Sequence, residues 1–100
     1  MHARTTTIEG RPDAIDEAVR QVESEVLSVL DAQAGFKGFT LHLNRSTGKV
    51  VGTSYWESED AMEASEEAVR GPREDAARRG GAAGGPVVEH FEVAIDTTTT

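Results

Sequence analysis

Three histidines, His2, His42 and His90, are the side chains of this sequence whose ionisation falls near neutral pH. An imidazole that titrates in this range can act as a general acid or base. His2 lies at the terminus and is given no role, so His42 and His90 are the candidate catalytic residues. The alternative for each is an interfacial or solvated residue. Because the three are widely spaced and the chain has no cysteine, the sequence predicts no metal site.

Aromatic side chains are scarce, with three Phe, one Trp and one Tyr, so we expect each at a position that matters for packing or for a pocket. The residues that could line a pocket for a small ring compound are Phe39, Tyr55, Trp56 and Met62. The alternative for Trp56 is ordinary core packing, since a single Trp more often serves burial.

Charged and glycine-rich segments have ordinary structural interpretations. The acidic residues between 57 and 67 are typical of a solvated helix face that also complements the helix dipole. Arg73, Arg78 and Arg79 are interpreted as an exposed basic helix end, and the alternative is attraction of an anionic substrate. Residues 80–85 (GGAAGG) precede a strand and lack the Gly-Lys-Ser/Thr ending of a phosphate loop, so they form a linker or a lid.

Length and composition exclude several classes of protein. The 100 residues allow one domain, expected at 1–96 with a disordered polar tail at 97–100. A net charge of −8 argues against nucleic acid as a partner, and the absence of an apolar stretch of about 18–20 residues argues against a membrane span. The N-terminus lacks the layout of a signal peptide, and the absence of cysteine fits a reducing compartment, so we expect a cytoplasmic protein.

Local patterns predict six elements. The β-branched residues of 2–8 favour a strand. A single apolar stripe predicts a helix over 12–33, with Pro12 in its first turn. A second helix follows the N-cap Ser58 to about residue 69, is interrupted by Gly71-Pro72, and resumes for one or two turns over 73–79. The remaining elements are a hairpin of 36–44 with 49–57 and a last strand over 87–95. The stripe consists of Ile15, Val19, Val22, Val26 and Leu30.

The hairpin's four-residue loop, which ends at Gly48, sets its register. Counting outward pairs Leu43 with Val50, Leu41 with Gly52, Phe39 with Ser54 and Lys37 with Trp56 on an apolar side that faces the helices. The pairs on the other, mixed side are His42 with Val51, Thr40 with Thr53 and Gly38 with Tyr55.

The order strand, helix, strand, strand, helix, strand predicts an α+β fold of the ferredoxin-like, split βαβ type. Its four-stranded antiparallel sheet has the strand order 4-1-3-2 and carries both helices on one face. The opposite face would expose apolar side chains, which monomers seldom leave open. We therefore expect a homodimer that packs sheet against sheet through this face.

The segment Tyr55–Met62 (YWESEDAM) resembles the antibiotic-biosynthesis-monooxygenase-like family of dimeric α/β barrels, in which a strand-end aromatic runs into a helix of this pattern. Gly10-Arg11-Pro12-Asp13, the strand entry at 35–38, the turn at 44–48 and the strand at 88–93 are similar to family features in the same order. The resemblance therefore covers nearly the whole chain.

The resemblance implies several activities known in the family, of which haem degradation is disfavoured. Haem-degrading members carry a Trp, a haem-ligating His and an Asn where this chain has Ser65, roughly Asp75, and Thr6 or Thr7. The remaining implication is a monooxygenase that oxidises a small aromatic or quinol-type molecule without a metal or flavin cofactor. The alternative is a non-enzymatic module of the same dimeric fold that binds a small ligand or serves assembly, since one fold hosts many functions.

Cavity volume separates the two hypotheses. A space of roughly 300 Å3 or more, lined by Trp56, Met62 and a histidine, would favour the enzyme. A helix–sheet space filled by Phe39, Leu41 and Val22 would favour the non-enzymatic module.

Overall fold

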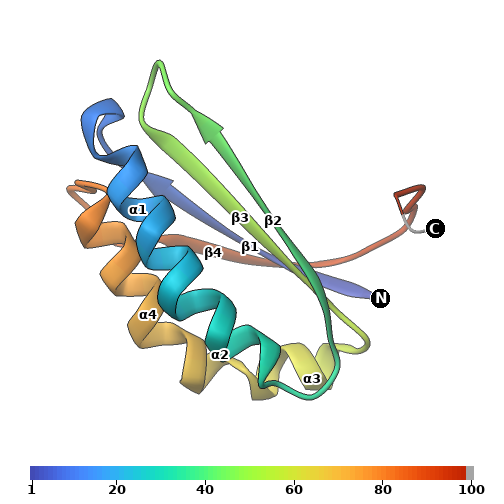
Figure 1. Ribbon diagram of the computed structural model, residues 1–100. Coiled ribbons are helices and arrows are strands. Elements are labelled where there is room, and N and C mark those ends of the chain that lie inside the picture. Colours follow the sequence, from blue (N-terminus) through green and yellow to red (C-terminus); the bar gives the residue numbers. More distant parts are fainter. Residues whose placement is uncertain (99–100) are drawn as a thin grey trace.

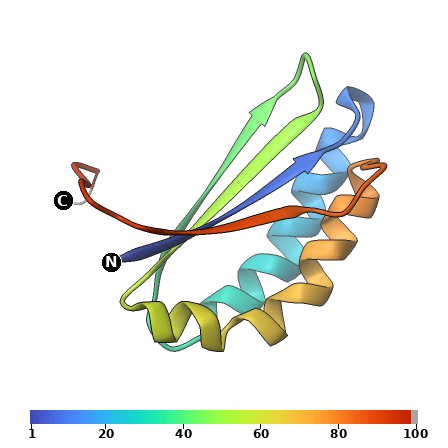
Figure 2. The ribbon, with the colours of Figure 1, turned by 180° about the vertical axis from the view of Figure 1, so that it is seen from behind.

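Four antiparallel strands form one sheet, in the order β2-β3-β1-β4 that the sequence predicts. They are β1 (His2–Glu9), β2 (Phe36–Asn44), β3 (Lys49–Trp56) and β4 (Val87–Glu92). All helices lie on one side of this sheet, as both views of the chain show (Figure 1, Figure 2). The computed structural model describes residues 1–98, so Thr99 and Thr100 of the predicted tail lie outside the described residues. The ferredoxin-like α+β fold is confirmed.

The first helix runs without a break through four segments: η1 (Pro12–Ala14), α1 (Ile15–Gln21), η2 (Val22–Val26) and α2 (Leu27–Asp31). Pro12 occupies the first turn, and no side chain caps this start. The predicted apolar stripe is confirmed, because four of its residues are buried and the fifth, Val19, is partly buried against the same core. The helix ends at Asp31, two residues before the predicted end, and its periodicity does not predict the π-helical turn over η2.

The second helix, which lies in the same layer, is interrupted at a different residue from the predicted one. α3 (Glu59–Ala64) starts at Ser58, whose hydroxyl accepts a hydrogen bond from the Ala61 amide at 3.1 Å. α4 (Glu66–Arg79) then continues through Pro72, and the interruption lies at Ser65. The prediction of a break at Gly71-Pro72 is wrong because burial of α4 against the first helix outweighs the local cost of a proline.

The hairpin register is confirmed for all but its last pair. A β-bulge between Phe36 and Gly38 replaces the predicted Lys37–Trp56 pair with Phe36–Trp56. The bulge keeps the Lys37 ammonium out of the helix-facing layer and puts the Phe36 ring beside Trp56, with centroids 5.5 Å apart in an edge-to-face arrangement. The apolar side therefore gains an aromatic contact where the simple count predicts a charge.

The uncovered face of the sheet carries three rows of side chains, each running across all four strands. The row at one end of the sheet is mostly apolar, the middle row is polar, and the third is mixed. The rows are Gly38–Tyr55–Ala3–Phe91, Thr40–Thr53–Thr5–Glu89 and His42–Val51–Thr7–Val87. Phe91 is 47% exposed and Val87 is 55% exposed. Within residues 1–98 no helix or strand covers this face, but Asp96 and Thr98 line a hollow of about 530 Å3 at one end of it together with Gly38, Thr40 and Tyr55.

Replacing Gly48 with alanine should destabilise the fold strongly. Gly48 has φ 87°, and a Cβ there would lie 2.5 Å from the carbonyl oxygen of Gly10. The left-handed backbone and the collision with main chain together cost about 3 kcal/mol. Gly84→Ala is the matched control, because nothing lies within 4 Å of its Cβ position. Urea unfolding followed by circular dichroism checks this, and equal midpoints for the two variants would contradict it.

Candidate functional site

A small cavity lies between the sheet and the helices, and we call it the helix–sheet cavity. Its volume is about 40 Å3. Most of its wall is apolar, and the exceptions are two arginines, a threonine and a serine. The lining residues are Arg4, Thr6, Ile8, Val22, Val26, Leu30, Phe39, Leu41, Val50, Gly52, Ser54, Val69, Arg73 and Ala76. This volume is enough for a few atoms or waters.

The cavity is much smaller than the roughly 300 Å3 expected for an enzyme pocket. Val22, Phe39 and Leu41, the residues that the non-enzymatic alternative places between helix and sheet, line it. Gly52 makes room for Phe39, whose ring would come within 3.0 Å of a Cβ at that position. A ring-sized ligand therefore has to displace lining side chains. We expect the Phe39 side chain to be displaced most readily, since it is only partly buried and lies on the edge strand β2.

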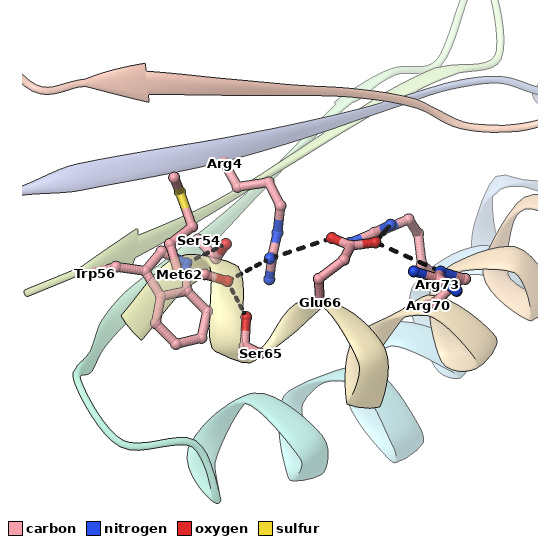
Figure 3. Close-up of polar contacts among 8 residues, drawn as sticks. All are labelled: Arg4, Ser54, Trp56, Met62, Ser65, Glu66, Arg70 and Arg73. Carbon is pink, nitrogen blue, oxygen red and sulfur yellow. Dashed lines mark hydrogen bonds and ion pairs between the residues drawn. The ribbon is translucent and has the colours of Figure 1, made fainter. Parts of the chain in front are cut away.

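Arg4 is a buried charge on β1 and points toward the helices. Its side chain is 2% exposed, and its guanidinium carbon lies 5.3 Å from the centroid of the Trp56 ring. Nη1 donates to the carbonyl oxygen of Met62 at 3.1 Å and to Glu66 at 3.4 Å (Figure 3). Nη2 is buried and has no hydrogen-bond partner.

The interruption between α3 and α4 lies next to the Met62 carbonyl, which accepts a hydrogen bond from Arg4. At Ser65 the regular helical ladder is interrupted, and the Met62 carbonyl accepts from the Ser65 hydroxyl at 2.7 Å as well as from Arg4. Figure 3 shows both bonds meeting at this carbonyl. The interruption of the helix therefore positions the Arg4 guanidinium.

Arg73 is the second buried cation of the cavity wall. Its guanidinium holds the Glu66 carboxylate with two hydrogen bonds, of 2.7 and 2.8 Å. Arg73 is 6% exposed, and its buried Nε has no hydrogen-bond partner. The interpretation of Arg73 as part of an exposed basic helix end is therefore wrong, because the helix that was expected to break at Pro72 continues and turns this residue inward. Arg78 is exposed, as predicted.

Glu66 is shared by three arginines. Arg4 and Arg73 contact it from the cavity side, and the exposed Arg70 lies 3.8 Å away on the outside. The hydrogen bonds from Arg73 hold the pKa of Glu66 below its usual value. Burial lowers the pKa of Arg4, and the neighbouring charge of Arg73 lowers it further. Two guanidinium groups thus face one carboxylate, which leaves a positive charge uncompensated beside the cavity.

The π-helical turn η2 supplies part of the wall opposite the sheet. Val22 and Val26, the first and last residues of this turn, both line the cavity. Such turns are frequent at functional sites. This turn lines the same cavity as the two buried arginines, which marks the cavity as the candidate site.

Of the sequence-predicted site residues, Phe39 and Tyr55 line one hollow of about 530 Å3 beside β2, and the others do not gather with them. His42 and Tyr55 lie on the uncovered face of the sheet. His90 pairs with Arg4, so it belongs to the helix-facing side, but it is exposed on the edge strand β4. The two histidines therefore lie on opposite faces and opposite edges of the sheet.

Trp56 and Met62 are part of the core. They are 0% and 1% exposed, and the indole Nε1 of Trp56 donates to the Ser54 hydroxyl at 2.8 Å. Phe39 is the one predicted pocket residue on the cavity wall. Among residues 1–98, no group of three His, Cys, Asp or Glu side chains could hold a metal ion.

The sequence alone gave little signal for the arginines. Arg4 lies in a short threonine-rich strand, where alternation allows either face. Its inward orientation follows only from its pairing with Ser54 on β3, which shares the Trp56 side.

The model of the antibiotic biosynthesis monooxygenase family matches residues 1–77. The chain belongs to the antibiotic biosynthesis monooxygenase family. It is also similar to two uncharacterised proteins of Mycobacterium tuberculosis. Rv2557 is 36% identical over 94 residues, and Rv2558 is 36% identical over 95 residues. These alignments take in 94% and 95% of this chain but 41% and 39% of the two relatives. The chain thus spans about two fifths of their length.

Solved structures with this monooxygenase-family fold superpose over almost the whole chain. One is the monooxygenase from the gene ActVA-Orf6 of Streptomyces coelicolor in complex with nanaomycin D, with a TM-score of 0.80, 19% identity, and coverage of 99% of this chain and 92% of that one. Another is Rv0793 from Mycobacterium tuberculosis, with a TM-score of 0.73, 14% identity, and coverage of 97% and 98%. At these identities the likeness establishes the fold. No helix of the described chain is both long and apolar enough to cross a bilayer.

Proposed function

We propose that the protein is a cofactor-independent monooxygenase that oxidises a small aromatic or quinol-type compound in the helix–sheet cavity. The observation that supports this most directly is the cavity itself, an apolar space that holds buried positive charge, in a chain of this family. Apolar walls exclude water, and fixed cationic donors stabilise an anion that develops on a substrate.

The chemistry asks for few protein groups. A phenolic substrate loses a proton, and its anion passes an electron to O2. One oxygen atom then enters the substrate and the other leaves as water with two substrate hydrogens, as when the methylene of an anthrone becomes the carbonyl of a quinone. The cavity wall would orient the ring and stabilise the anion through Arg4 and Arg73.

Oxygen uptake by the purified protein tests this proposal. We expect consumption of O2 with at least one member of a panel of anthrones, naphthols and quinols, and formation of the corresponding quinone. Arg73→Lys should lower the rate by about tenfold, because a lysine cannot reproduce the guanidinium fork. His42→Ala and His90→Ala test the two histidines as proton acceptors. Since neither lines the cavity, we expect their rates within about twofold of the wild type, the range of a surface change.

A small-ligand-binding module without turnover is the second candidate, and the small volume of the cavity favours it. Its expected signature is saturable binding of a panel compound with no oxygen uptake and no change of the bound compound. Absence of both uptake and binding across the panel would contradict both candidates.

We also propose that a second copy of this chain covers the uncovered face of the sheet. Phe91 and Val87 are exposed there, in the same two rows as Tyr55 and Val51, an arrangement that favours a homodimer through apolar contact. Placing a charge in one of these rows should therefore weaken association.

Tyr55→Asp should convert a dimer to a monomer or weaken it by at least about tenfold, because the new carboxylate would be desolvated at the interface. Ser28→Asp adds the same side chain at an exposed helical position and is the control. Light scattering after size-exclusion chromatography measures the mass of each. A monomeric wild type, or an unchanged mass for Tyr55→Asp, would count against this assembly.

A further inference from the structure

Two buried hydrogen-bond donors of the cavity wall have no partner in the protein. They are Nη2 of Arg4 and Nε of Arg73, and we call these two residues the arginine pair. Buried polar groups are almost always hydrogen-bonded, so an unpaired donor on a buried cation is exceptional. Both donors belong to side chains that line the same cavity and are more than nine-tenths buried.

Other nitrogens of the arginine pair make hydrogen bonds that fix both side chains. Arg73 is clamped to Glu66 through both terminal nitrogens, and Arg4 is held by the Met62 carbonyl and by Glu66. Figure 3 shows the two guanidinium groups approaching the same carboxylate from different elements, β1 and α4. The unpaired donors are therefore held in place in advance, which lowers the entropic cost of binding an acceptor.

The net charge of Arg4, Arg73 and Glu66 together favours the binding of an anion. One carboxylate balances two guanidinium groups on the cavity side, and the surrounding wall is mostly apolar. In such surroundings an unpaired positive charge is far less well stabilised than in water. The cavity of about 40 Å3 holds a single anionic oxygen or a carboxylate-sized group.

We propose that the arginine pair is a binding site for the ionised oxygen of an aromatic ligand, a phenolate in preference to the neutral phenol. The site takes the proton-free form of the ligand, so ionisation is driven by the cavity's own charge and no histidine beside the ring is needed. This rests on the proposed function for its ligand class. It adds that the ligand binds already ionised, and that Nη2 of Arg4 and Nε of Arg73 are the donors to its oxygen.

The net charge of the protein makes this preference diagnostic. A chain of net charge −8 repels anions at long range, so weak surface adsorption would favour the neutral form of a phenol. A preference for the phenolate therefore reports a local cationic site.

The test uses 4-nitrophenol, whose phenolate absorbs visible light and whose neutral form does not, with nitrobenzene as the uncharged analogue. At a pH below the pKa of the free phenol, adding wild-type protein should raise the phenolate absorbance in a saturable way. We expect the phenolate to bind at least about tenfold more tightly than nitrobenzene, as suits a hydrogen bond to a charged group. Equal affinity for the two, or no change in phenolate absorbance, would overturn the proposal. If only water molecules bind the two donors, the phenolate absorbance will not change.

Arg73→Lys and Arg4→Lys keep a cation but remove the fork of donors, and each should reduce the phenolate preference by about tenfold. Arg70→Lys is the matched control, because Arg70 contacts the same carboxylate from outside, is exposed and does not line the cavity. Its preference should stay within about twofold of wild type. An equal loss in Arg70→Lys would overturn the assignment to the arginine pair.

Two further readouts keep the test decisive. Circular dichroism identifies any variant that fails to fold, and in that case the comparison of 4-nitrophenol with nitrobenzene on the wild type decides the proposal. Oxygen uptake is measured separately. Phenolate preference without oxygen uptake supports the anion site and contradicts the monooxygenase, while oxygen uptake without phenolate preference overturns the anion site.

Discussion

Glu66→Gln is expected to destabilise the protein by about 2–4 kcal/mol, because it removes the one carboxylate that balances two buried guanidinium groups. Deleting one partner of a fully buried ion pair costs about 3–5 kcal/mol, and the partial exposure of Glu66 reduces that cost. Glutamine keeps the size and one acceptor, so the loss reports the charge. Urea unfolding measured by circular dichroism gives the value.

Glu67→Gln is the matched control for this prediction. Glu67 is the next residue of α4, carries the same side chain and is exposed. We expect its free energy of unfolding to stay within about 0.5 kcal/mol of wild type. If Glu66→Gln behaved like its neighbour, the arginines would have to be stabilised by something other than Glu66.

The contribution of Glu66 to the free energy of unfolding should also depend on pH. The pKa of Glu66 is lowered in the folded protein, so between the folded and unfolded values the unfolded chain binds more protons. The stability that Glu66 contributes is therefore complete above its unfolded pKa of about 4.5 and is lost as the pH falls through the lower folded value. The difference between wild type and Glu66→Gln should accordingly shrink in acid. A difference that grew in acid would contradict the assigned direction.

Trp56→Ala is the second change with a large expected effect, a loss of about 3–5 kcal/mol in the free energy of unfolding. Trp56 is 0% exposed, packs edge-to-face with Phe36 and lies beside the Arg4 guanidinium. Its removal leaves a large void, takes away the aromatic face beside a buried cation and leaves the Ser54 hydroxyl without its donor.

Trp56→Phe separates these contributions. It retains a ring for Phe36 and Arg4 but loses the indole N–H, so we expect a smaller loss of about 1–2 kcal/mol. Because Trp56 is the single tryptophan, circular dichroism is the readout for all three proteins. A cost for Trp56→Ala below about 1 kcal/mol would mean that this part of the core tolerates the cavity.

The site was predictable only in its outline. Phe39 was expected at a pocket and lies on the cavity wall, because the hairpin register fixes the face of every second residue of β2. The histidines could not be placed relative to each other, since no turn fixes the register of β4 and therefore the face on which His90 lies. The roles of His42 and His90 stay predictions for the oxygen-uptake measurement.

The arginine pair shows why the rest could not be predicted. Arg73 is inward-facing because α4 passes through Pro72 unbroken, and local propensity favours a break there. Arg4 is inward-facing because β1 pairs with β3 in a register that no turn between them specifies. Charged side chains are rarely buried, and these two are tolerated because Glu66 lies beside both guanidinium groups. Glu66 is distant in sequence from Arg4 but belongs to the same helix as Arg73.

The sequence by itself determined the order of elements, the strand order of the sheet, the apolar stripe of the first helix and the hairpin register up to Gly38. Each of these depends on short-range signals, namely periodicity, caps and a glycine turn. Only the tertiary structure decided the bulge at Lys37, the helix break at Ser65 and the burial of Arg4 and Arg73. Those features arise from packing and charge pairing between segments far apart in the chain, where the energy of the whole core outweighs local preference.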